Sequence, residues 1–398
     1  MSRVIISGGG TGGHIYPAIA IAQAILQREP EAEILFIGAL GKLEMEKVPA
    51  AGFRIEGLPV AGFIRRMTLK NLSFPFKLMK SMQRAKKIIR GFRPGVVVGV
   101  GGYASGPALR VATSLGIPAL IQEQNSFPGV TNRILGKRVD RICVAYPGME
   151  RYFPEDKILL TGNPVRADLT GLPDHLPEAF SHFGLDPAKK TLLVLGGSGG
   201  AKTINESILA LLLQGNPEGI QVLWQTGKYY FEEVQRQLTD MRYAMRDARY
   251  GISDVLHDKE SEAMSSRIPH PASRILPFID RMDFAYSCAD LVVSRAGAIV
   301  ISELCLVGKP VILIPSPNVA EDHQTKNALA LSDQQAAILI RDREALSLLP
   351  EKILELMGDR ETRERLSNRI RTLAIPDSAS RIAGEVFRLV KTNVRLHG

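Results

Sequence analysis

Short apolar runs alternate with amphipathic stretches along most of the chain. The apolar runs lie at 33–37, 96–100, 119–122 and 141–145 in the first half, and at 220–225, 274–276, 291–293 and 311–315 in the second. Apolar runs without polar alternation are typical of strands buried on both faces. The intervening stretches repeat with helical spacing, as at 17–26, where Pro17 is expected in the first turn. The alternation predicts βαβ units and an α/β fold with parallel sheets.

The same opening occurs twice in the sequence. RVIISGGGTGGH begins the first half and TLLVLGGSGGAKTIN begins the second, each reading as strand, glycine turn and helix. This repetition predicts two Rossmann-like domains, at 1–163 and 164–375, followed by a helical tail at 376–398. Gly162 and Pro164 interrupt the pattern at the boundary. The polar stretch 239–273 is interpreted as an excursion of the second domain.

The first glycine loop, at 8–13, satisfies the GxGxxG pattern. Glycines let the backbone approach a phosphate, and the N-terminus of the following helix favours an anion. An NAD enzyme would also place an acid at the end of the second strand. That strand ends in Gly38 and Ala39 instead, so the dehydrogenase interpretation is weaker. A turn needed only for packing is the alternative, and the matched second loop favours function over it.

Two side chains at the glycine loops are candidates for chemistry. Ser198 in the second loop could donate to a phosphate oxygen, or could act as a helix N-cap. His14 follows the first loop directly, and its near-neutral intrinsic pKa makes it a candidate general base. A merely structural histidine is the alternative.

Two later segments carry polar groups that suit a sugar nucleotide. In RAGAIVISE, Gly297 is expected to make a turn and Glu303 to lie about one turn into the next helix, where a carboxylate can accept two vicinal hydroxyls. A partner for the helix dipole is the alternative role of Glu303. Gln324 lies in a polar loop after the run at 311–315 and could hold sugar hydroxyls, or could simply be solvated.

Composition narrows the class of protein. The chain has 398 residues, which favours two domains. Its three cysteines form no CxxC pair, which argues against disulfides and a zinc site. No secretory signal pattern and no spanning apolar run is found, so a soluble protein, or one associated with a membrane from one side, is expected. The net charge of +9 is uneven: 57–122 contains no acidic residue, while 63–93 contains ten cations.

The motifs taken together resemble one family. GGGTGGHIYPAIAIA, VGGYASGP, IQEQNSFPG, GNPVR, GGSGGA, FIDRM, SRAGAIVISE and DHQTKNA occur in the order found in the N-acetylglucosaminyltransferases of peptidoglycan synthesis. These enzymes move N-acetylglucosamine from UDP-N-acetylglucosamine to undecaprenyl-pyrophosphoryl-N-acetylmuramoyl-pentapeptide, converting lipid I to lipid II. The resemblance covers Gly8 to about Asn327. It implies a GT-B fold, in which two parallel sheets face a central cleft, with the acceptor held by the first domain and the donor mainly by the second.

The resemblance also implies roles for individual residues. Thr11, Gly12 and Gly13 would face the donor sugar or diphosphate, and Asn125 would reach the sugar. Arg166 and Ser198 would contact the nucleotide, and Ile279 would meet the uracil through its backbone. The remaining donor contacts would come from Ala298, Ile299, Val300, Ile301, Ser302, Glu303 and Gln324, with Glu303 on the ribose and Gln324 on the sugar. His323 stands where the family often has another glutamine, and 239–273 is longer than the usual connection.

The expected reaction is a direct, inverting displacement with His14 as the leading candidate base. No DxD pair is present and no cofactor or metal is expected. Apolar residues interleave with the ten cations of Phe63–Arg93, which favours an anionic membrane surface. A nucleic-acid groove is the rival, but it calls for stacking aromatics and a recognised module. The resemblance implies a peripheral protein on the cytoplasmic face of the inner membrane, acting in cell shape and division within cell-wall synthesis complexes. A UDP-N-acetylglucosamine 2-epimerase and a non-catalytic nucleotide-sugar sensor remain the alternatives.

Overall fold

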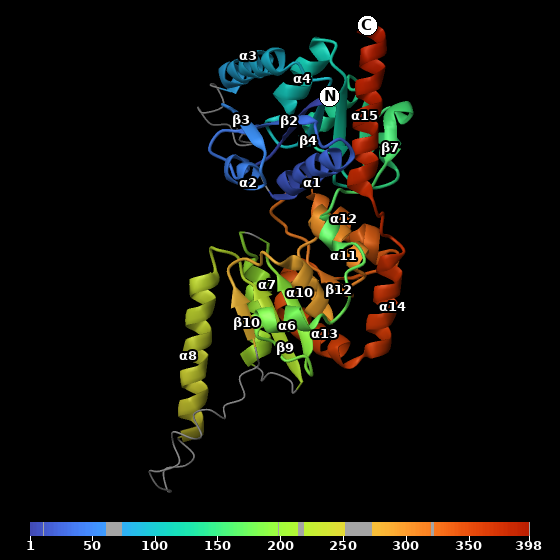
Figure 1. Cartoon of the computed structure of the whole chain (residues 1–398). Helices are drawn as coiled ribbons and strands as arrows, with labels where there is room; N and C mark the ends of the chain where they lie inside the picture. The colour runs from blue at the N-terminus through green and yellow to red at the C-terminus, as the bar shows by residue number, and fades with distance from the viewer. Residues whose placement is uncertain are drawn as a thin grey trace. The chain divides into compact units, whose positions relative to one another are not determined.

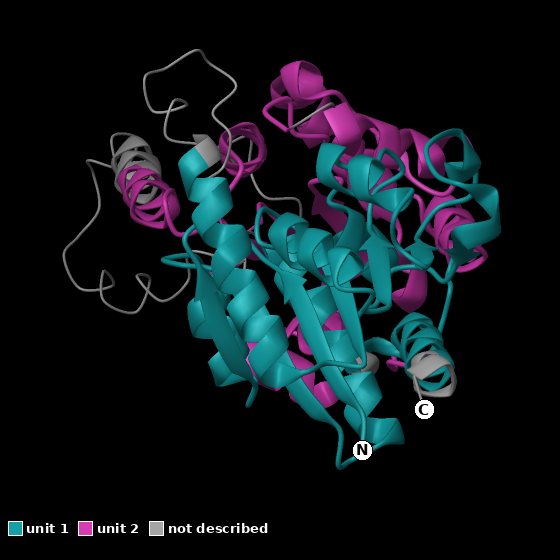
Figure 2. Ribbon diagram, turned by 90° about the horizontal axis from the view of Figure 1, so that it is seen from above, with its two compact units in different colours: residues 1–170, 297–303, 374–398 teal, residues 171–296, 304–373 magenta. Residues whose placement is uncertain are grey.

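The computed structural model describes residues 1–10, 12–60, 74–197, 199–213, 219–250, 273–319 and 322–397. Its contacts divide the chain into two compact units. Unit 1 comprises residues 1–170, 297–303 and 374–398, and unit 2 comprises residues 171–296 and 304–373 (Figure 2). Each unit contains one parallel sheet with helices on its faces (Figure 1). The predicted α/β class with two parallel sheets is confirmed.

Unit 1 contains a seven-stranded parallel sheet in the order β3-β2-β1-β4-β5-β6-β7. Its strands are β1 (Arg3–Gly8), β2 (Glu33–Ala39), β3 (Arg54–Leu58), β4 (Val96–Gly101), β5 (Ala119–Glu123), β6 (Arg141–Val144) and β7 (Ile158–Leu160). Its helices are α1 (Gly12–Arg28), α2 (Glu44–Ala50), α3 (Phe74–Phe92), α4 (Ser105–Ser114), α5 (Val130–Gly136) and α15 (Ser378–His397), with short 3-10 turns at 149–151, 155–157 and 167–169.

Alternate residues of the unit 1 strands enter two separate cores. Val4 and Ile6 face a core that includes Ile382 of α15, whereas Ile5 faces a core that includes Ile89 of α3. Helices α1 and α15 therefore cover one face of the sheet, and α3 and α4 cover the other. Strands buried on both faces have no polar side to alternate with, which is why they read as continuous apolar runs.

Unit 2 contains a six-stranded parallel sheet in the order β10-β9-β8-β11-β12-β13. Its strands are β8 (Lys190–Leu195), β9 (Ile220–Gln225), β10 (Ser273–Leu276), β11 (Leu291–Ser294), β12 (Val311–Leu313) and β13 (Ile338–Leu339). Its helices are α6 (Pro177–Phe183), α7 (Lys202–Leu213), α8 (Phe231–Tyr250), α10 (Met282–Cys288), α12 (His323–Ser332), α13 (Ala345–Gly358) and α14 (Arg360–Arg371), with a 3-10 turn at 342–344. Helix α11 (Ala298–Val307) begins in unit 1 and ends in unit 2.

Both sheets reverse their strand order beside their first strand. The reversal lies between β1 and β4 in unit 1 and between β8 and β11 in unit 2. Ligands of open parallel sheets bind outside the carboxyl ends of the strands at such a switch point. The glycine loops of the sequence follow these same strands, so the topology places them where a site is expected.

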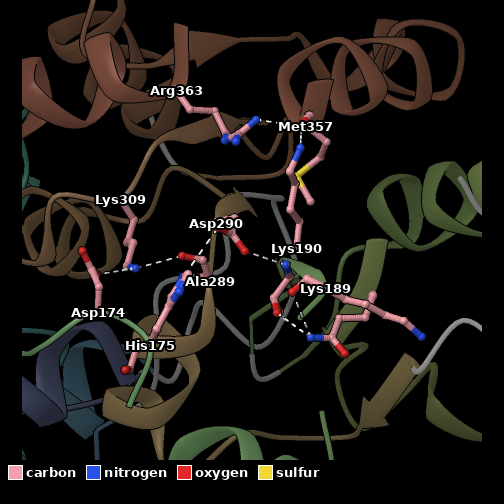
Figure 3. A network of polar contacts seen from close by, with 12 residues as sticks. Asp174, His175, Lys189, Lys190, Ala289, Asp290, Lys309, Met357 and Arg363 are labelled. Carbon is pink, nitrogen blue, oxygen red and sulfur yellow. Dashed lines mark hydrogen bonds and ion pairs between the residues drawn. The ribbon is translucent and has the colours of Figure 1, made fainter. Parts of the chain in front are cut away.

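The opposite end of the unit 2 sheet is tied by a polar network (Figure 3). The N–H of Thr191 donates to Asp290 over 2.7 Å. The buried ammonium of Lys309 lies 2.6 Å from an Asp174 carboxylate oxygen and donates to the carbonyl of Ala289 over 2.8 Å. These groups lie at the amino ends of β8 and β11, away from the glycine loops. The network therefore stabilises the sheet and does not form part of the candidate site.

The predicted position of Pro17 is wrong. Helix α1 begins at Gly12, so Pro17 lies in its interior rather than in its first turn. Proline lacks an N–H, and the carbonyl of Gly13 therefore lacks its usual partner four residues on. Within the described residues, no helix combines the length and apolar character needed to cross a bilayer.

Candidate active site

The loops that follow β1 and β4 touch through their backbones. A Cβ on Gly102 would lie 2.1 Å from the carbonyl oxygen of Gly9, and Gly102 has a φ of +82°. Only glycine can occupy such a position without displacing the neighbouring loop. The first glycine loop is thus shaped by contact with the loop of VGGYASGP, as well as by the turn into α1.

A buried carboxylate occupies the inside of the first glycine loop. Glu44 is 1% exposed, and it accepts from the N–H of Gly10 over 2.8 Å and from the N–H of Ala39 over 2.9 Å. A Cβ on Gly9 would lie 2.2 Å from this carboxyl group. The N–H of Gly10 therefore binds an anion supplied by the chain itself. This arrangement does not suit the dinucleotide cradle that the GxGxxG pattern alone would suggest.

His14 lies in the first turn of α1, with its imidazole against the end of β4. A Cβ on Gly101 would lie 2.6 Å from Cδ2 and 2.8 Å from Nε2 of His14. The ring is half-buried, and the side-chain oxygen of Gln124 would lie 3.6 Å from the same Cβ position. The predicted base thus lies at the switch point between β1 and β4, where a reacting hydroxyl could reach it. Gly12 and Gly13 open the same helix, and Thr11 lies outside the described residues.

The QEQN segment spans the end of β5 and is organised around Glu123. This side chain is 2% exposed and accepts from the N–H of Asn125 over 3.0 Å, from Nδ2 of Asn125 over 3.3 Å and from Nδ2 of Asn132 over 2.8 Å. Burial raises the pKa of the Glu123 carboxyl, and the N–H donors lower it by less. The backbone N–H and the side-chain Nδ2 of Asn125 both face Glu123. The side-chain oxygen of Asn125 is therefore directed away from the Glu123 carboxyl group.

The first six residues of α11, Ala298–Glu303, are all predicted substrate contacts. Ile301 donates its N–H to the carbonyl of Gly297 over 3.0 Å, which confirms the expected turn and helix start. Ala298, Ile301 and Glu303 are buried, whereas Ile299, Val300 and Ser302 are half-buried.

Arg166 and Glu303, both predicted to contact the nucleotide, form an ion pair. Nε of Arg166 lies 3.7 Å from a carboxylate oxygen of Glu303, whose side chain is 9% exposed. Arg166 lies in the segment that follows β7, and Glu303 lies at the end of the first turn of α11. The structure therefore brings these two predicted residues together.

In unit 2 the loops after β8 and β9 interlock. A Cβ on Gly227 would lie 2.1 Å from the backbone nitrogen of Gly200, and a Cβ on Gly200 would lie 2.4 Å from the carbonyl oxygen of Thr226. Asn205 of α7 donates to that same carbonyl over 3.1 Å. The backbone of the second glycine loop is thus fixed by β9, and Ser198 within it lies outside the described residues.

The other predicted donor contacts lie on separate loops of unit 2. Ile279 is 2% exposed, and its N–H donates to the side-chain oxygen of Gln225 over 2.9 Å, so this N–H is already engaged. The side-chain oxygen of Gln324 accepts from the N–H of Ser316 over 2.8 Å, which fixes the start of α12 to the loop after β12. The guanidinium of Arg295 binds the carbonyl of Ile314 over 3.2 Å and also binds Asp342.

Sequence reasoning missed three residues that organise the site. Glu44 was not singled out, and Glu123 and Asn163 were quoted only as letters of QEQN and GNPVR. All three are buried polar side chains, at 1%, 2% and 3% exposure. The signal was their position beside glycines or after apolar strands. The partners of Asn163 and the Gly10 partner of Glu44 are distant in the sequence, whereas Glu123 binds residues two to nine positions further on.

The chain matches two family models. Residues 4–144 match the glycosyltransferase family 28 N-terminal domain, and residues 191–382 match the glycosyltransferase family 28 C-terminal domain.

Relatives of similar length occur in other bacteria. One from Phocaeicola vulgatus is 53% identical over 387 residues, which cover 97% of this chain and 96% of the relative. One from Parabacteroides distasonis is 52% identical over 388 residues, 98% of each chain. Both are named UDP-N-acetylglucosamine–N-acetylmuramyl-(pentapeptide) pyrophosphoryl-undecaprenol N-acetylglucosamine transferase. The crystal structure of Acinetobacter baumannii MurG is 25% identical, with a TM-score of 0.72 over 98% of this chain and 100% of that one.

Proposed function

Because the chain belongs to glycosyltransferase family 28, we propose that it transfers N-acetylglucosamine from UDP-N-acetylglucosamine to lipid-linked N-acetylmuramoyl-pentapeptide. The observation that carries this function is the identity of about half of all positions, over nearly the whole chain, with transferases named for this reaction. The product is lipid II, the disaccharide precursor of peptidoglycan. The chain is thus an N-acetylglucosaminyltransferase of cell-wall synthesis.

The reaction is a single displacement at the anomeric carbon. The C4 hydroxyl oxygen of the muramoyl residue attacks C1 of the donor sugar from the face opposite the diphosphate. A C1–O bond to the acceptor forms as the C1–O bond to UDP breaks, and the configuration inverts. The hydroxyl proton passes to a base, for which we assign His14. Support for this role is its half-buried place at the β1–β4 switch point.

The donor is assigned to the loops of unit 2 and to the first turn of α11. The second glycine loop and the N-terminus of α11 present backbone N–H groups, which stabilise the negative charge that grows on the departing diphosphate. Glu303 is assigned to the ribose hydroxyls and Gln324 to the sugar hydroxyls. The observed pair of Arg166 with Glu303 supports a nucleotide site here. The guanidinium would lie beside the phosphates as well as beside the Glu303 carboxylate that is assigned to the ribose hydroxyls.

The first glycine loop is assigned to the acceptor side. Its Gly10 N–H already binds Glu44, so this N–H is not open to a phosphate. Asn125 is assigned to the donor sugar, with its amide nitrogen held toward Glu123.

Helix α3 is proposed to dock on the cytoplasmic face of the membrane. Phe76, Leu78 and Met79 are 66%, 38% and 54% exposed on it. They stand among the cations of the acid-free segment, and α3 itself carries no acidic residue. Exposed apolar groups beside cations suit an anionic lipid surface, where each cation contributes about 1 kcal/mol. An acceptor with a lipid tail explains why the protein would bind a membrane through this surface, whereas a nucleic-acid partner would not explain the exposed apolar side chains.

The function is tested with labelled UDP-N-acetylglucosamine and a lipid I analogue. We expect UDP release only when the acceptor is present, together with labelled disaccharide product. Release of UDP without acceptor, or conversion of the free nucleotide sugar to its 2-epimer, would identify an epimerase. Tight binding of UDP-N-acetylglucosamine without either reaction would identify a sensor protein.

A further inference from the structure

Asn163 is a buried amide that joins two of the segments assigned to substrate. It is 3% exposed and lies in GNPVR, between β7 and the 3-10 turn at 167–169. Its Nδ2 donates to the carbonyl of Gln124 over 3.1 Å and to the hydroxyl of Ser302 over 3.0 Å. The carbonyl of Ala298 lies 3.4 Å from the same nitrogen. An amide nitrogen has two hydrogens, so this longest contact is shared with one of the other two.

The oxygen of the Asn163 amide is also occupied. It accepts from Nε2 of Gln122 over 3.1 Å. The amide is thus held on the β5 side through Gln122 and Gln124, and on the α11 side through Ser302 and Ala298. A buried polar group with this many partners has one orientation, because any rotation would leave a donor or an acceptor unsatisfied.

The contacts on α11 fix one peptide group. The hydroxyl of Ser302 donates to the carbonyl of Ala298 over 3.0 Å, and Asn163 adds its shared contact to that carbonyl. The Ala298–Ile299 peptide is trans, so the N–H of Ile299 points in the direction opposite to the carbonyl. In the first turn of a helix that N–H points outward and has no partner within the helix. The donors that bind the Ala298 carbonyl therefore orient the N–H of Ile299, which is available to a diphosphate.

From these contacts we propose that Asn163, acting through Ser302, is a positioning residue for the donor diphosphate. It holds the Ala298–Ile299 peptide at a fixed place relative to the QEQN segment, which carries Asn125. Neither Asn163 nor the Ser302 hydroxyl needs to touch the donor for this role, so Ser302 changes from an expected substrate contact to a support. The inference rests on the proposed function, because it takes α11 as the donor-binding helix.

The experiment measures UDP affinity by calorimetry without acceptor, and KM for UDP-N-acetylglucosamine with it. Asn163→Ala is expected to weaken UDP binding about tenfold and to raise this KM by a similar factor, since about 1.4 kcal/mol is lost. Ser302→Ala is expected to weaken binding by about threefold to tenfold. Ser302→Thr keeps a hydroxyl and is expected to bind within about twofold of the unchanged protein.

Gln221→Ala is the matched control. Gln221 is a fully buried amide that binds Asp186 and Thr191 at the amino end of β9, away from the glycine loops. Its loss is expected to lower the unfolding temperature about as much as Asn163→Ala does, while UDP affinity stays unchanged. This comparison separates positioning of the donor from general destabilisation.

A double variant decides how Ser302 acts. If Ser302 supports the peptide together with Asn163, the Asn163→Ala, Ser302→Ala protein binds UDP only about as weakly as Asn163→Ala alone. If the double variant instead binds UDP more weakly by the product of the two single-variant factors, the proposal is overturned and Ser302 is a direct contact. UDP affinity within twofold of the unchanged protein in Asn163→Ala would also overturn it. If Asn163→Ala does not fold, Asn163→Ser replaces it, both alone and in the double variant.

The two proposals fail in different ways. Transfer by the unchanged protein together with normal UDP binding by the Asn163 variant overturns the positioning role alone. Absence of both UDP binding and transfer in the unchanged protein overturns the proposed function, and the positioning role with it.

Discussion

The place of His14 against Gly101 makes its role testable at the level of one side chain. His14→Ala is expected to lower kcat by at least about 100-fold with both substrates saturating, because a positioned base contributes about 10²–10⁴-fold. His182→Ala, an exposed histidine on α6, is the control and is expected to leave turnover unchanged. Near-normal turnover of the His14 variant would exclude it as the base, and an unfolding temperature measured alongside shows that the fold is kept.

Glu123 gives the fold a pH dependence of a definite sign. Burial raises the pKa of this carboxyl above its ordinary value of 4.5. A raised pKa means that the folded state holds the proton more tightly than the unfolded state. The stabilising contribution is therefore complete below pH 4.5 and is lost as the pH rises through the folded-state pKa.

The measurement compares the unchanged protein with Glu123→Gln by denaturant unfolding between pH 3 and 8. The free energy of unfolding of the unchanged protein, relative to that of Glu123→Gln, is expected to fall as the pH rises. Glu29 is the opposite control, because hydrogen bonds from Ser2 lower the pKa of its carboxyl. Its advantage over Glu29→Gln is expected to be lost as the pH falls instead. A rising advantage for Glu123 would contradict the assigned direction.

At the residue scale the sequence offers candidates for the chemistry, but not the buried side chains that support them. His14, Asn125 and Glu303 stand out because of their place after apolar strands or in a first helical turn. Glu44 was out of reach because its carboxylate turns back five residues to Ala39 and across to Gly10, a contact that depends on strand order. The absence of an acid at the end of β2 was correctly noted, yet Glu44 still brings a carboxylate to that strand's end.

Among the loops, the close approach of Gly227 to Gly200 predicts that a side chain at position 227 destabilises the protein more than one at another glycine with a positive φ. Gly227 has a φ of +84° and its Cβ would lie 2.1 Å from a backbone nitrogen, whereas Gly219 has a φ of +82° with nothing within 4 Å. Gly219→Ala should cost about 1–2 kcal/mol for the backbone conformation alone. Gly227→Ala should cost at least about 2 kcal/mol more and also weaken UDP binding, because the second glycine loop must move. Equal unfolding free energies and equal UDP affinities for the two variants would contradict the interlock.

Helix α3 allows a test of membrane docking that leaves the site intact. Phe76→Ser with Met79→Ser is expected to weaken binding to phosphatidylglycerol vesicles about tenfold, which corresponds to about 1.4 kcal/mol of lost apolar burial. Transfer to a water-soluble acceptor should be unchanged. Leu346→Ser with Leu348→Ser on α13 is the control, because these side chains are also exposed, at 53% and 46%. Equal loss of binding by both pairs, measured by co-sedimentation, would remove α3 as the docking surface.

At the element scale the buried central strands were predictable, whereas three of the four edge strands were not. Each apolar run predicted as a strand overlaps one in the structure, with ends shifted by at most two residues. Strands β3, β7 and β13 were missed because they lie at or near sheet edges, where fewer residues are buried and the apolar signal is weak. Part of the predicted excursion, up to Tyr250, is helix α8, and the rest lies outside the described residues, as does 63–73 of the predicted membrane segment.

For the whole molecule, the chain crosses between the two units more often than the sequence suggested. The tail predicted at 376–398 is mostly helix α15, which packs on α1 and contributes Ile382, Ala383, Val386 and Leu389 to a core of unit 1. Residues 297–303 also group with unit 1, although the sequence around them belongs to unit 2. Periodicity shows that α15 is an amphipathic helix, but it carries no information on which sheet receives its apolar face.

This division predicts that the two units respond separately to damage in their cores. Ile382 and Ile353 are both fully buried, the first in a core of unit 1 and the second in the core of unit 2. Either change to alanine should cost about 2–5 kcal/mol within its own unit. Ile382→Ala should therefore reduce amide-exchange protection in β1 and β4 while β8 and β11 keep theirs, and Ile353→Ala should do the reverse. Equal loss of protection in both sheets from either variant would show that the chain unfolds as one cooperative body.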